Sequence, residues 1–425
     1  MDTRIAFQTH GCSNNFSESE IMAGLLKKSG FKIVDSKQDA DIIILNICTV
    51  KGNKTAFDAI SELKKLNKKI ILAGCIPKDS YKEYRKLLPD SCFISTHNIS
   101  QIVEIAEEAK NETVIDLMTE TREPKICLPK IRRNRHVGII PILSGCNNKC
   151  SYCSVKLIKG DLFSYPISSV LNEAEKCIRD GCRELWITSM DNAAYGMEQG
   201  KAKLPELLRS VLKLEGNFRI RLGMMNPGNV LKILDELVEI YRNDKMYKFL
   251  HIPVQSGNNN ILKAMNRQYR VEEFIKIVDV FESEIPDIAI STDIICGFPG
   301  ETDEQFGDSA DLIKEIMPDV LNISRYVPRQ RTRAFYMENQ IHGNVSKERS
   351  RVLTEIQNNI GRMKNEKWLG WKGTVFVSEK KEDFIGRNYA YKPVVIKSDE
   401  EDLLGREVEV KIIKTLPHYL AGRLV

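Results

Sequence analysis

Three cysteines lie within eight residues of one another in the segment SGCNNKCSYC (144–153), at Cys146, Cys150 and Cys153. A disulfide takes two thiols and a structural zinc site takes four ligands, so three grouped thiols indicate another use. Three thiolates can hold three irons of a cubic iron–sulfur cluster and leave the fourth iron open to a further ligand. A zinc site completed by a distant fourth ligand is the alternative.

A second set of three cysteines is spread along the first part of the chain. Cys12, Cys48 and Cys75 each come just after a short apolar run, in FQTHGC, LNIC and LAGC. Parallel strands end at one edge of their sheet, so we expect these thiols to converge there. Coincidence is the alternative, because a lone cysteine is usually a small buried hydrophobic residue. The pattern predicts a second cluster, again with one iron not ligated by protein.

Length and amino-acid composition limit the classes of protein to which this chain can belong. The 425 residues predict two or three domains, with 42% apolar and 28% charged residues. No apolar run reaches the roughly 20 residues that span a membrane, and the N-terminus lacks a signal-peptide pattern. We therefore expect a cytoplasmic protein without membrane association, in which grouped cysteines among the eleven bind metal. The net charge of +5 is compatible with nucleic acid.

The chain should fold into α/β domains. In residues 1–110, strand-like runs at 4–9, 41–47 and 69–74 alternate with amphipathic stretches such as 17–30, which has an acidic first turn and a basic last turn. This alternation predicts a doubly wound parallel sheet. The polar segment 111–136, with its basic end KIRRNRH, is interpreted as a linker.

The rest of the chain predicts two further domains. Over residues 137–367 we expect an incomplete (βα)6 barrel, with a charged helix at about 346–367 that leads to the last domain. The barrel strands are expected at 137–143, 185–188, 218–223, 249–254, 288–295 and 320–326. Short alternating strands within 368–425 predict a small antiparallel β-barrel.

The spacing C-x3-C-x2-C, with Tyr152 before the last cysteine, resembles the signature of the radical S-adenosylmethionine (radical SAM) superfamily. The resemblance implies a 4Fe-4S cluster whose open iron binds S-adenosylmethionine and whose reduction releases a 5′-deoxyadenosyl radical. It also implies contacts to this cofactor from Tyr152 and from residues at later strand ends. These are Ser189 and Asp191 in TSMDNAAYG, Arg221 in RLGMMNP, Gln255 in HIPVQSG and Gly297 in ICGFPGE. His251, in the same HIPVQSG segment as Gln255, is interpreted as a core histidine whose hydrogen bonds are satisfied. For Arg221, the alternative to cofactor contact is a salt bridge on the rim of the barrel.

Both cysteine sets together resemble the methylthiotransferase family, through GCSNNFSESE, LNICTV and AGCIP. The tail resembles a TRAM domain. NICTVKGNKTAFDAI and KLIKGDLFSYPISSV are most similar to the archaeal and eukaryotic type, which modifies N6-threonylcarbamoyladenosine in tRNA. This implies insertion of a methylthio group at C2 beside the anticodon, with two 4Fe-4S clusters, S-adenosylmethionine, a low-potential electron donor and a sulfur donor. The alternatives are isopentenyladenosine or a ribosomal-protein aspartate as substrate, and a non-catalytic iron–sulfur RNA-binding regulator.

Cations and aromatic side chains suggest how RNA would be held. The basic end of the linker supplies Arg132, Arg133 and Arg135, and GRNYAYKPVVI supplies Arg387, Tyr389 and Lys392. Residues 372–425 carry ten basic and nine acidic residues, so RNA binding there requires local grouping. The family usually has Pro-Gly-Thr-Pro after the last barrel strand, whereas this chain has RYVPRQRTRAF (325–335), with added arginines that either face RNA or are solvated surface.

Overall fold

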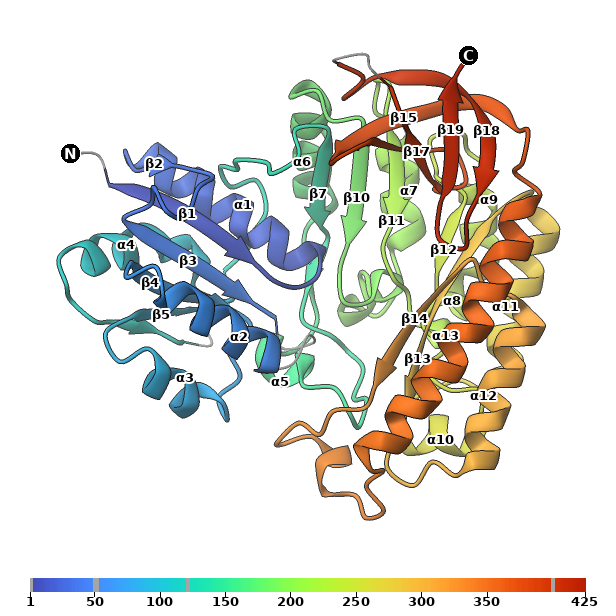
Figure 1. Cartoon of the computed structure of the whole chain (residues 1–425), viewed down its shortest axis with the longest axis horizontal. Helices are drawn as coiled ribbons and strands as arrows, with labels where there is room; N and C mark the ends of the chain where they lie inside the picture. The colour runs from blue at the N-terminus through green and yellow to red at the C-terminus, as the bar shows by residue number, and fades with distance from the viewer. Residues whose placement is uncertain (1–2, 49–52, 120–122, 399–401) are drawn as a thin grey trace. The chain divides into compact units, whose positions relative to one another are not determined.

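A computed structural model of the chain describes residues 3–48, 53–119, 123–398 and 402–425 (Figure 1). Its contacts divide the chain into two units. Unit 1 comprises residues 1–133, 139–148 and 153–173, and unit 2 comprises residues 134–138, 149–152 and 174–425. Thr49 and Val50, part of the LNICTV motif, lie outside the described residues. Among the described residues, no helix combines the length and the apolar character needed to cross a membrane.

A six-stranded, all-parallel sheet forms the centre of unit 1, in the order β2-β1-β3-β4-β5-β6. Its strands are β1 (Arg4–Thr9), β2 (Lys32–Ile33), β3 (Ile42–Ile47), β4 (Lys69–Gly74), β5 (Cys92–Ser95) and β6 (Asp116–Leu117). All six residues of β3 are buried, as expected for a central strand with helices on both faces. The predicted doubly wound parallel sheet is confirmed.

Two cores lie on the two faces of this sheet, because successive side chains of a strand point in opposite directions. Ile42 and Ile44 of β3 join the core under α1 (Ser13–Lys28) and α4 (Ile102–Lys110). Ile43 and Leu45 join the core under α2 (Asn53–Lys64) and α3 (Tyr81–Leu87). Figure 1 shows these two helix pairs on opposite sides of the blue and cyan strands. A short 3-10 turn, η2 (Ile99–Gln101), precedes α4.

Helix α1 begins earlier than predicted. Its first turn carries no acidic residue, because the helix starts at Ser13 rather than at residue 17. Cys12 is the extended N-cap residue, so the helix begins immediately behind the first thiol. Glu18 and Glu20, predicted to lie in an acidic first turn, lie instead in the second turn and are buried, at 1% and 5% exposure.

The segment interpreted as a linker takes part in the fold of unit 1. It contributes β6, which pairs with β5, and the buried side chain of Lys125. Unit 1 also contains the hairpin of β8 (Leu143–Ser144) and β9 (Phe163–Ser164), which encloses α5 (Val155–Lys159). Strand β7 (Val137–Pro141) and helix α6 (Ile167–Arg179) begin in one unit and end in the other.

The six predicted barrel strands are all present, which confirms the incomplete (βα)6 barrel. They form two three-stranded parallel groups in the orders β11-β10-β7 and β12-β13-β14. The strands of this set that follow β7 are β10 (Glu184–Thr188), β11 (Arg219–Leu222), β12 (Phe249–His251), β13 (Ala289–Cys296) and β14 (Val320–Arg325).

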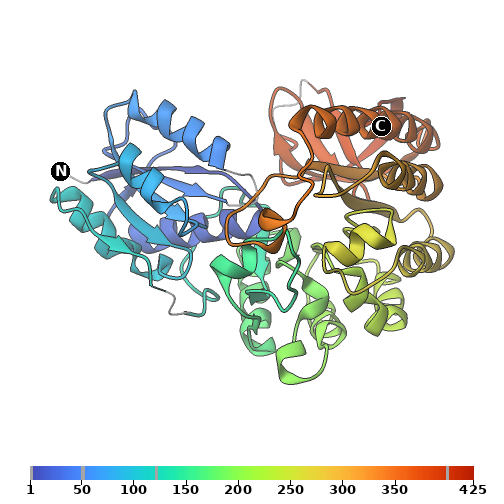
Figure 2. The ribbon, with the colours of Figure 1, turned by 90° about the horizontal axis from the view of Figure 1, so that it is seen from below.

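Helices follow these strands and lie in an arc when unit 2 is seen from below (Figure 2). They are α7 (Leu204–Leu212), α8 (Pro227–Val230), α9 (Leu234–Tyr241), α10 (Asn259–Ala264), α11 (Val271–Glu284), α12 (Asp303–Ile316) and the long α13 (Gly343–Glu366). Single turns lie between them at η3 (Asn192–Ala194), η4 (Met197–Gln199), η5 (Leu231–Ile233) and η6 (Arg333–Tyr336).

The C-terminal strands close into a five-stranded barrel in the order β15-β16-β17-β19-β18, as predicted. They are β15 (Lys372–Lys380), β16 (Phe384–Arg387), β17 (Pro393–Ile396), β18 (Glu407–Thr415) and β19 (Leu420–Leu424). One pair, β17 with β19, is parallel rather than antiparallel. A closed ring with an odd number of strands cannot alternate direction throughout, so one parallel pair is unavoidable.

Candidate metal and cofactor site

The structure brings Cys12, Cys48 and Cys75 together at the carboxyl edge of the unit 1 sheet. They follow β1, β3 and β4, which are neighbours in that sheet. The Cys48 thiol donates a hydrogen bond to Cys12, and this bond outweighs burial and lowers the pKa of Cys12 to about 6. Burial raises the pKa of Cys75. The convergence that the strand pattern predicted is therefore a feature of the fold, and the binding of a cluster there stays a prediction.

Two buried asparagines support the three thiols. The Asn15 side-chain oxygen accepts a hydrogen bond from Cys12 (3.3 Å), and its amide group lies 4.0 Å from the Cys75 sulfur. The same amide donates to Ile47 O at 3.0 Å, and the Asn46 amide donates to Asn15 O at 2.9 Å. Both asparagines are 0% exposed.

Two glycines make room for this arrangement. A Cβ on Gly11 would lie 2.5 Å from the Cβ of Cys48, and one on Gly74 would lie 2.1 Å from the Asn46 side-chain oxygen. Their φ angles of +138° and +101° also favour glycine. The three strand ends can therefore approach closely enough for their thiols to share one ligand.

A buried charge network lies beside these thiols. Glu18 Oε1 accepts hydrogen bonds from Lys125 Nζ at 2.5 Å and from Lys159 Nζ at 2.9 Å. Burial alone would raise the pKa of Glu18, but Lys125 and Lys159 outweigh it and lower that pKa to about 2. Burial alone would lower the pKa of Lys159, but the nearby Cys75, Glu18 and Cys12 raise it above its ordinary value. Lys159 therefore favours negative charge on the Cys12 and Cys75 sulfurs, although burial outweighs it at Cys75.

The donor set and its electropositive surroundings fit an iron–sulfur cluster held at three corners, because thiolates are the ligands of such clusters. Among the described residues, no group of three or more His, Cys, Asp or Glu side chains is placed to hold a single metal ion. A cluster differs from a single ion in binding its cysteines at separate irons.

The second cysteine set occupies the loop between β8 and α5. In unit 1, the Cys146 N–H donates to Gly160 O at 3.2 Å, and the Asn148 N–H points at the Cys146 sulfur at 3.4 Å. The preceding Gly145 has a φ of +75°, and a Cβ there would lie 1.9 Å from Asp161 O. The loop therefore leaves the β8–β9 hairpin through a position that only glycine can occupy.

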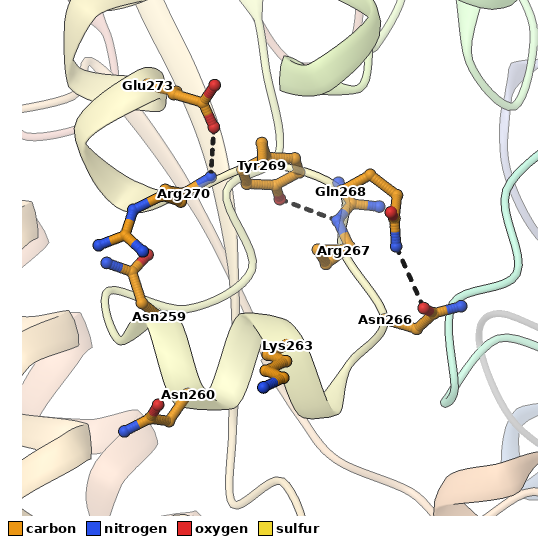
Figure 3. A pocket seen from close by; sticks show the side chains of 9 residues that line it. All are labelled: Asn259, Asn260, Lys263, Asn266, Arg267, Gln268, Tyr269, Arg270 and Glu273. Atoms are coloured by element: carbon orange, nitrogen blue, oxygen red, sulfur yellow. Dashed lines mark hydrogen bonds between the residues drawn. The ribbon is translucent and has the colours of Figure 1, made fainter.

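In unit 2, a guanidinium group lies against the middle cysteine of this set. Arg267 donates from Nη1 to the Cys150 sulfur at 3.4 Å, from Nη2 to Pro253 O at 3.1 Å and from Nε to the Tyr269 hydroxyl at 2.8 Å. It forms one wall of a pocket of about 560 Å³ between α10 and the start of α11 (Figure 3). The other lining residues are Asn259, Asn260, Lys263, Asn266, Gln268, Tyr269, Arg270 and Glu273. Hydrogen bonds on three nitrogens thus fix a positive charge at Cys150.

The segment with the unusual RYVPRQRTRAF sequence also contacts this loop within unit 2. The Ala334 N–H donates to Ser151 O at 2.8 Å, and the Ser151 hydroxyl donates to Ala264 O at 2.8 Å. Tyr152 packs against the small core formed by Ile261, Met265, Phe298 and Ala334. Arg331 and Arg333 are exposed. The altered segment therefore supports the backbone next to the cysteines while its arginines face outward.

The predicted cofactor residues Ser189 and Asp191 are both buried, at 4% and 2% exposure. The Ser189 hydroxyl oxygen accepts from the Asp191 N–H at 3.2 Å. Asp191 accepts from the Asn226 N–H at 2.9 Å and from the Asn229 amide at 2.8 Å. Asp191 thus joins the end of β10 to the start of α8.

The other predicted cofactor residues lie on β11, after β12 and after β13. Arg221 is within β11 rather than after it, and its guanidinium lies 5.3 Å from the centre of the Phe249 ring. Gln255 has a φ of +76° and bridges to Ile294 of β13. Gly297 has a φ of +76°, and a Cβ there would lie 2.1 Å from the Ser346 hydroxyl oxygen, so α13 fills the space that its missing side chain leaves. Cofactor contact by these residues stays a prediction.

The predicted RNA-binding residues have unequal exposure. Arg133 and Arg135 are exposed, and the Arg133 guanidinium also lies 5.0 Å from the centre of the Phe16 ring. Arg132 and Arg387 are half-buried. Lys392 is 7% exposed and pairs with Asp319 at 2.6 Å, while the Tyr389 hydroxyl donates to Asp287 at 2.7 Å. Arg133 and Arg135 are therefore the exposed cations of this predicted set, and RNA contact by any of these residues stays a prediction.

Sequence reasoning missed the polar residues that surround the thiols. Asn15 carried a weak signal, because an Asn-Asn pair begins two residues after the first cysteine. Lys159, Lys125 and Arg267 carried none, since their partners lie 141, 107 and 117 positions away along the chain.

Comparison with known proteins defines the class of the fold. Residues 140–313 match the Radical SAM superfamily, residues 374–425 match the TRAM domain, and residues 4–95 match the "Uncharacterized protein family UPF0004". Among solved structures, the chain is similar in fold to the radical S-adenosylmethionine methyltransferase TsrM from Kitasatospora setae. That similarity has a TM-score of 0.56 and 13% identity, over 79% of this chain and 77% of that one.

Full-length relatives define the family. The probable threonylcarbamoyladenosine tRNA methylthiotransferase of Archaeoglobus fulgidus is 41% identical, over 99% of this chain and 98% of the relative. The threonylcarbamoyladenosine tRNA methylthiotransferase of Homo sapiens is 36% identical, over 99% of this chain and 74% of the relative. This chain belongs to the threonylcarbamoyladenosine tRNA methylthiotransferase family.

Proposed function

We propose that this protein inserts a methylthio group at C2 of N6-threonylcarbamoyladenosine, next to the anticodon of tRNA. The observation that carries the proposal is the convergence of Cys12, Cys48 and Cys75 at one sheet edge, in a chain that also has the C-x3-C-x2-C loop. The full-length similarity to relatives named for this substrate supports it.

The two cysteine sets would hold two 4Fe-4S clusters. Cys146, Cys150 and Cys153 would hold the radical-generating cluster, and Cys12, Cys48 and Cys75 the auxiliary cluster that carries sulfur. The first cluster, with S-adenosylmethionine, would supply the radical chemistry that an unactivated purine C–H requires. Arg267 would keep a positive charge at Cys150, and Asn15 would orient the thiols of Cys12 and Cys75.

The remaining roles belong to side chains around the cysteines and on the surface. S-Adenosylmethionine would be bound by Tyr152, Ser189, Asp191, Arg221, Gln255 and Gly297. The tRNA would be bound by Arg132, Arg133 and Arg135, with Arg387 and Tyr389 contributing from the C-terminal barrel. Lys392, which was predicted with them, is instead committed to Asp319 and Asn365. A low-potential electron donor and a sulfur donor in the cytoplasm would complete the reaction.

The test uses the full chain, reconstituted with iron and sulfide without oxygen. The protein is incubated with reductant, S-adenosylmethionine, sulfide and tRNA that carries threonylcarbamoyladenosine, and the tRNA is digested to nucleosides for mass spectrometry. We expect a methylthio mass increment on that nucleoside, and loss of the increment in Cys12→Ala and Cys150→Ala. Iron content should be about eight per chain, and about four when either cysteine set is replaced.

The alternatives give different outcomes. A methylthio increment on isopentenyladenosine, or on a ribosomal-protein aspartate offered in place of tRNA, would contradict the proposed substrate. With both clusters loaded, an absence of both 5′-deoxyadenosine and modified nucleoside would favour a non-catalytic RNA-binding regulator.

A further inference from the structure

Four buried side chains from distant parts of unit 1 meet beside the thiols of the auxiliary set. They are Glu18 of α1, Thr96 after β5, Lys125 after β6 and Lys159 at the end of α5, with exposures of 1%, 1%, 6% and 3%. The Thr96 hydroxyl donates to Glu18 at 2.6 Å and accepts from both ammonium groups at 3.0 Å. These hydrogen bonds hold the two lysine ammonium groups and the carboxylate in fixed positions.

The group carries more positive than negative charge. Two ammonium groups share one carboxylate oxygen, Glu18 Oε1. A buried charge without a counter-charge is costly, so a stable fold needs a further anion within reach. Thr96, which bonds both ammonium groups, donates its N–H to Gly74 O at 2.8 Å, and Gly74 directly precedes Cys75. A cluster held by the auxiliary cysteines would therefore supply the missing negative charge next to this network.

The position of Lys159 along the chain also relates the charge network to the C-x3-C-x2-C loop. Lys159 is the last residue of α5, the short helix that begins two residues after Cys153. The neighbouring Ile158 is held by a contact of 2.6 Å between its carbonyl oxygen and His97 Nε2. The helix that follows the radical-SAM cysteines thus ends at the charge network of the auxiliary thiols.

We infer that Lys159 is a positioning residue of the auxiliary centre, whose ammonium group stabilises the negative charge of the cluster and of an anionic sulfur ligand bound to it. The inference rests on the proposed function, because it assumes that Cys12, Cys48 and Cys75 hold a cluster. Removing the ammonium should disfavour the more negative, reduced cluster and lower its reduction potential. It should also weaken the binding of hydrosulfide about tenfold, as expected for loss of one charge-assisted contact.

The test uses the full chain with Cys146, Cys150 and Cys153 all replaced by Ala, so that only the auxiliary centre is loaded. Lys159→Met, Lys159→Arg and Lys156→Met are compared by iron content, by the midpoint potential in a redox titration and by the dissociation constant of hydrosulfide. Lys156 is the matched control, since it lies on the same helix but pairs with the exposed Asp161 at 3.0 Å. We expect a lower potential and weaker hydrosulfide binding only in Lys159→Met, with Lys159→Arg close to the parent.

Lys125→Met keeps the inference testable if Lys159→Met loads no iron, because it removes the other ammonium from the same network. A lower potential in that variant supports the inference. A potential that is unchanged in both methionine variants, or that falls equally in Lys156→Met, overturns it. A parent that binds no iron after loss of Cys146, Cys150 and Cys153 would contradict the two-cluster function itself, which separates the two failures.

Discussion

A cation is placed at each of the two cysteine sets, and each is fixed by its own partners. Arg267 is held by Pro253 O and the Tyr269 hydroxyl while it donates to Cys150. Lys159 is held by Glu18 and Thr96. A cation whose position is fixed before a cluster binds needs no reorganisation to act on it, so these two residues should influence redox properties more than a surface lysine does.

The Arg267 contact leads to a testable prediction. In a chain whose auxiliary cysteines are replaced by Ala, Arg267→Met should lower the reduction potential of the remaining cluster, because a buried positive charge favours the reduced form. A redox titration measures this, and Arg267→Lys should recover part of the shift. Lys263→Met is the control, since Lys263 lines the same pocket. Equal potentials in Arg267→Met and Lys263→Met would contradict a role for Arg267 at Cys150.

Among the elements, the order and type of the strands could be predicted from sequence more readily than the residues that join them. The predicted runs at 4–9 and 69–74 match β1 and β4 residue for residue. A short apolar run bounded by turn residues is a local signal of a buried strand, so it can be recognised in the sequence. The sequence pattern places the start of helix α1 four residues late, because acidic residues such as Glu18 indicate the first turn of a helix. In the structure, Glu18 accepts hydrogen bonds from two lysines that are more than 100 positions away in the chain. No local sequence pattern predicts such a pairing.

The junction of the β13 end with α13 gives a prediction for these elements. Gly297→Ala should lower the stability of the protein by about 2–4 kcal/mol, because the new Cβ meets the Ser346 hydroxyl oxygen and the φ is positive. The melting temperature of the apoprotein at a fixed scan rate measures the change.

The double variant Gly297→Ala with Ser346→Gly separates the two causes. Removal of the serine side chain should restore most of the stability and leave about 1 kcal/mol of backbone strain. An equally unstable double variant would show that α13 does not set the requirement for glycine.

In the whole molecule, a buried charge network fixes the C-terminal barrel within unit 2. Lys392, next to β17, pairs with Asp319 at 2.6 Å and donates to Asn365 of α13 at 2.8 Å. Lys364 of α13 pairs with the same carboxylate at 3.0 Å. The cations and tyrosines of GRNYAYKPVVI predict Lys392 as an RNA contact, because the sequence does not reveal its distant partner Asp319. These ion pairs and hydrogen bonds therefore hold the barrel at a defined position within unit 2.

Asp319→Asn should destabilise the apoprotein and should do so with a defined pH dependence. Burial alone would raise the pKa of Asp319, but Lys392 and Lys364 outweigh it and hold that pKa below its ordinary value of 3.8. A carboxylate with a lowered pKa stabilises the fold above pH 3.8 and loses this effect only as the pH falls through its folded-state pKa. Breaking the buried pair should cost about 3–5 kcal/mol, which for a chain of this length lowers the melting temperature by about 3–6 °C.

The measurement is the difference in melting temperature between the parent and Asp319→Asn across a pH series. We expect this difference to stay constant from about pH 8 to pH 5 and to shrink only at more acidic pH, because the carboxylate stays ionised throughout the higher range. Asp279→Asn, at an exposed position of α11, is the matched control and should change little. A difference that already disappears between neutral pH and pH 5 would show that Asp319 gains its proton in the folded protein, and that the barrel is held by contacts other than this ion pair.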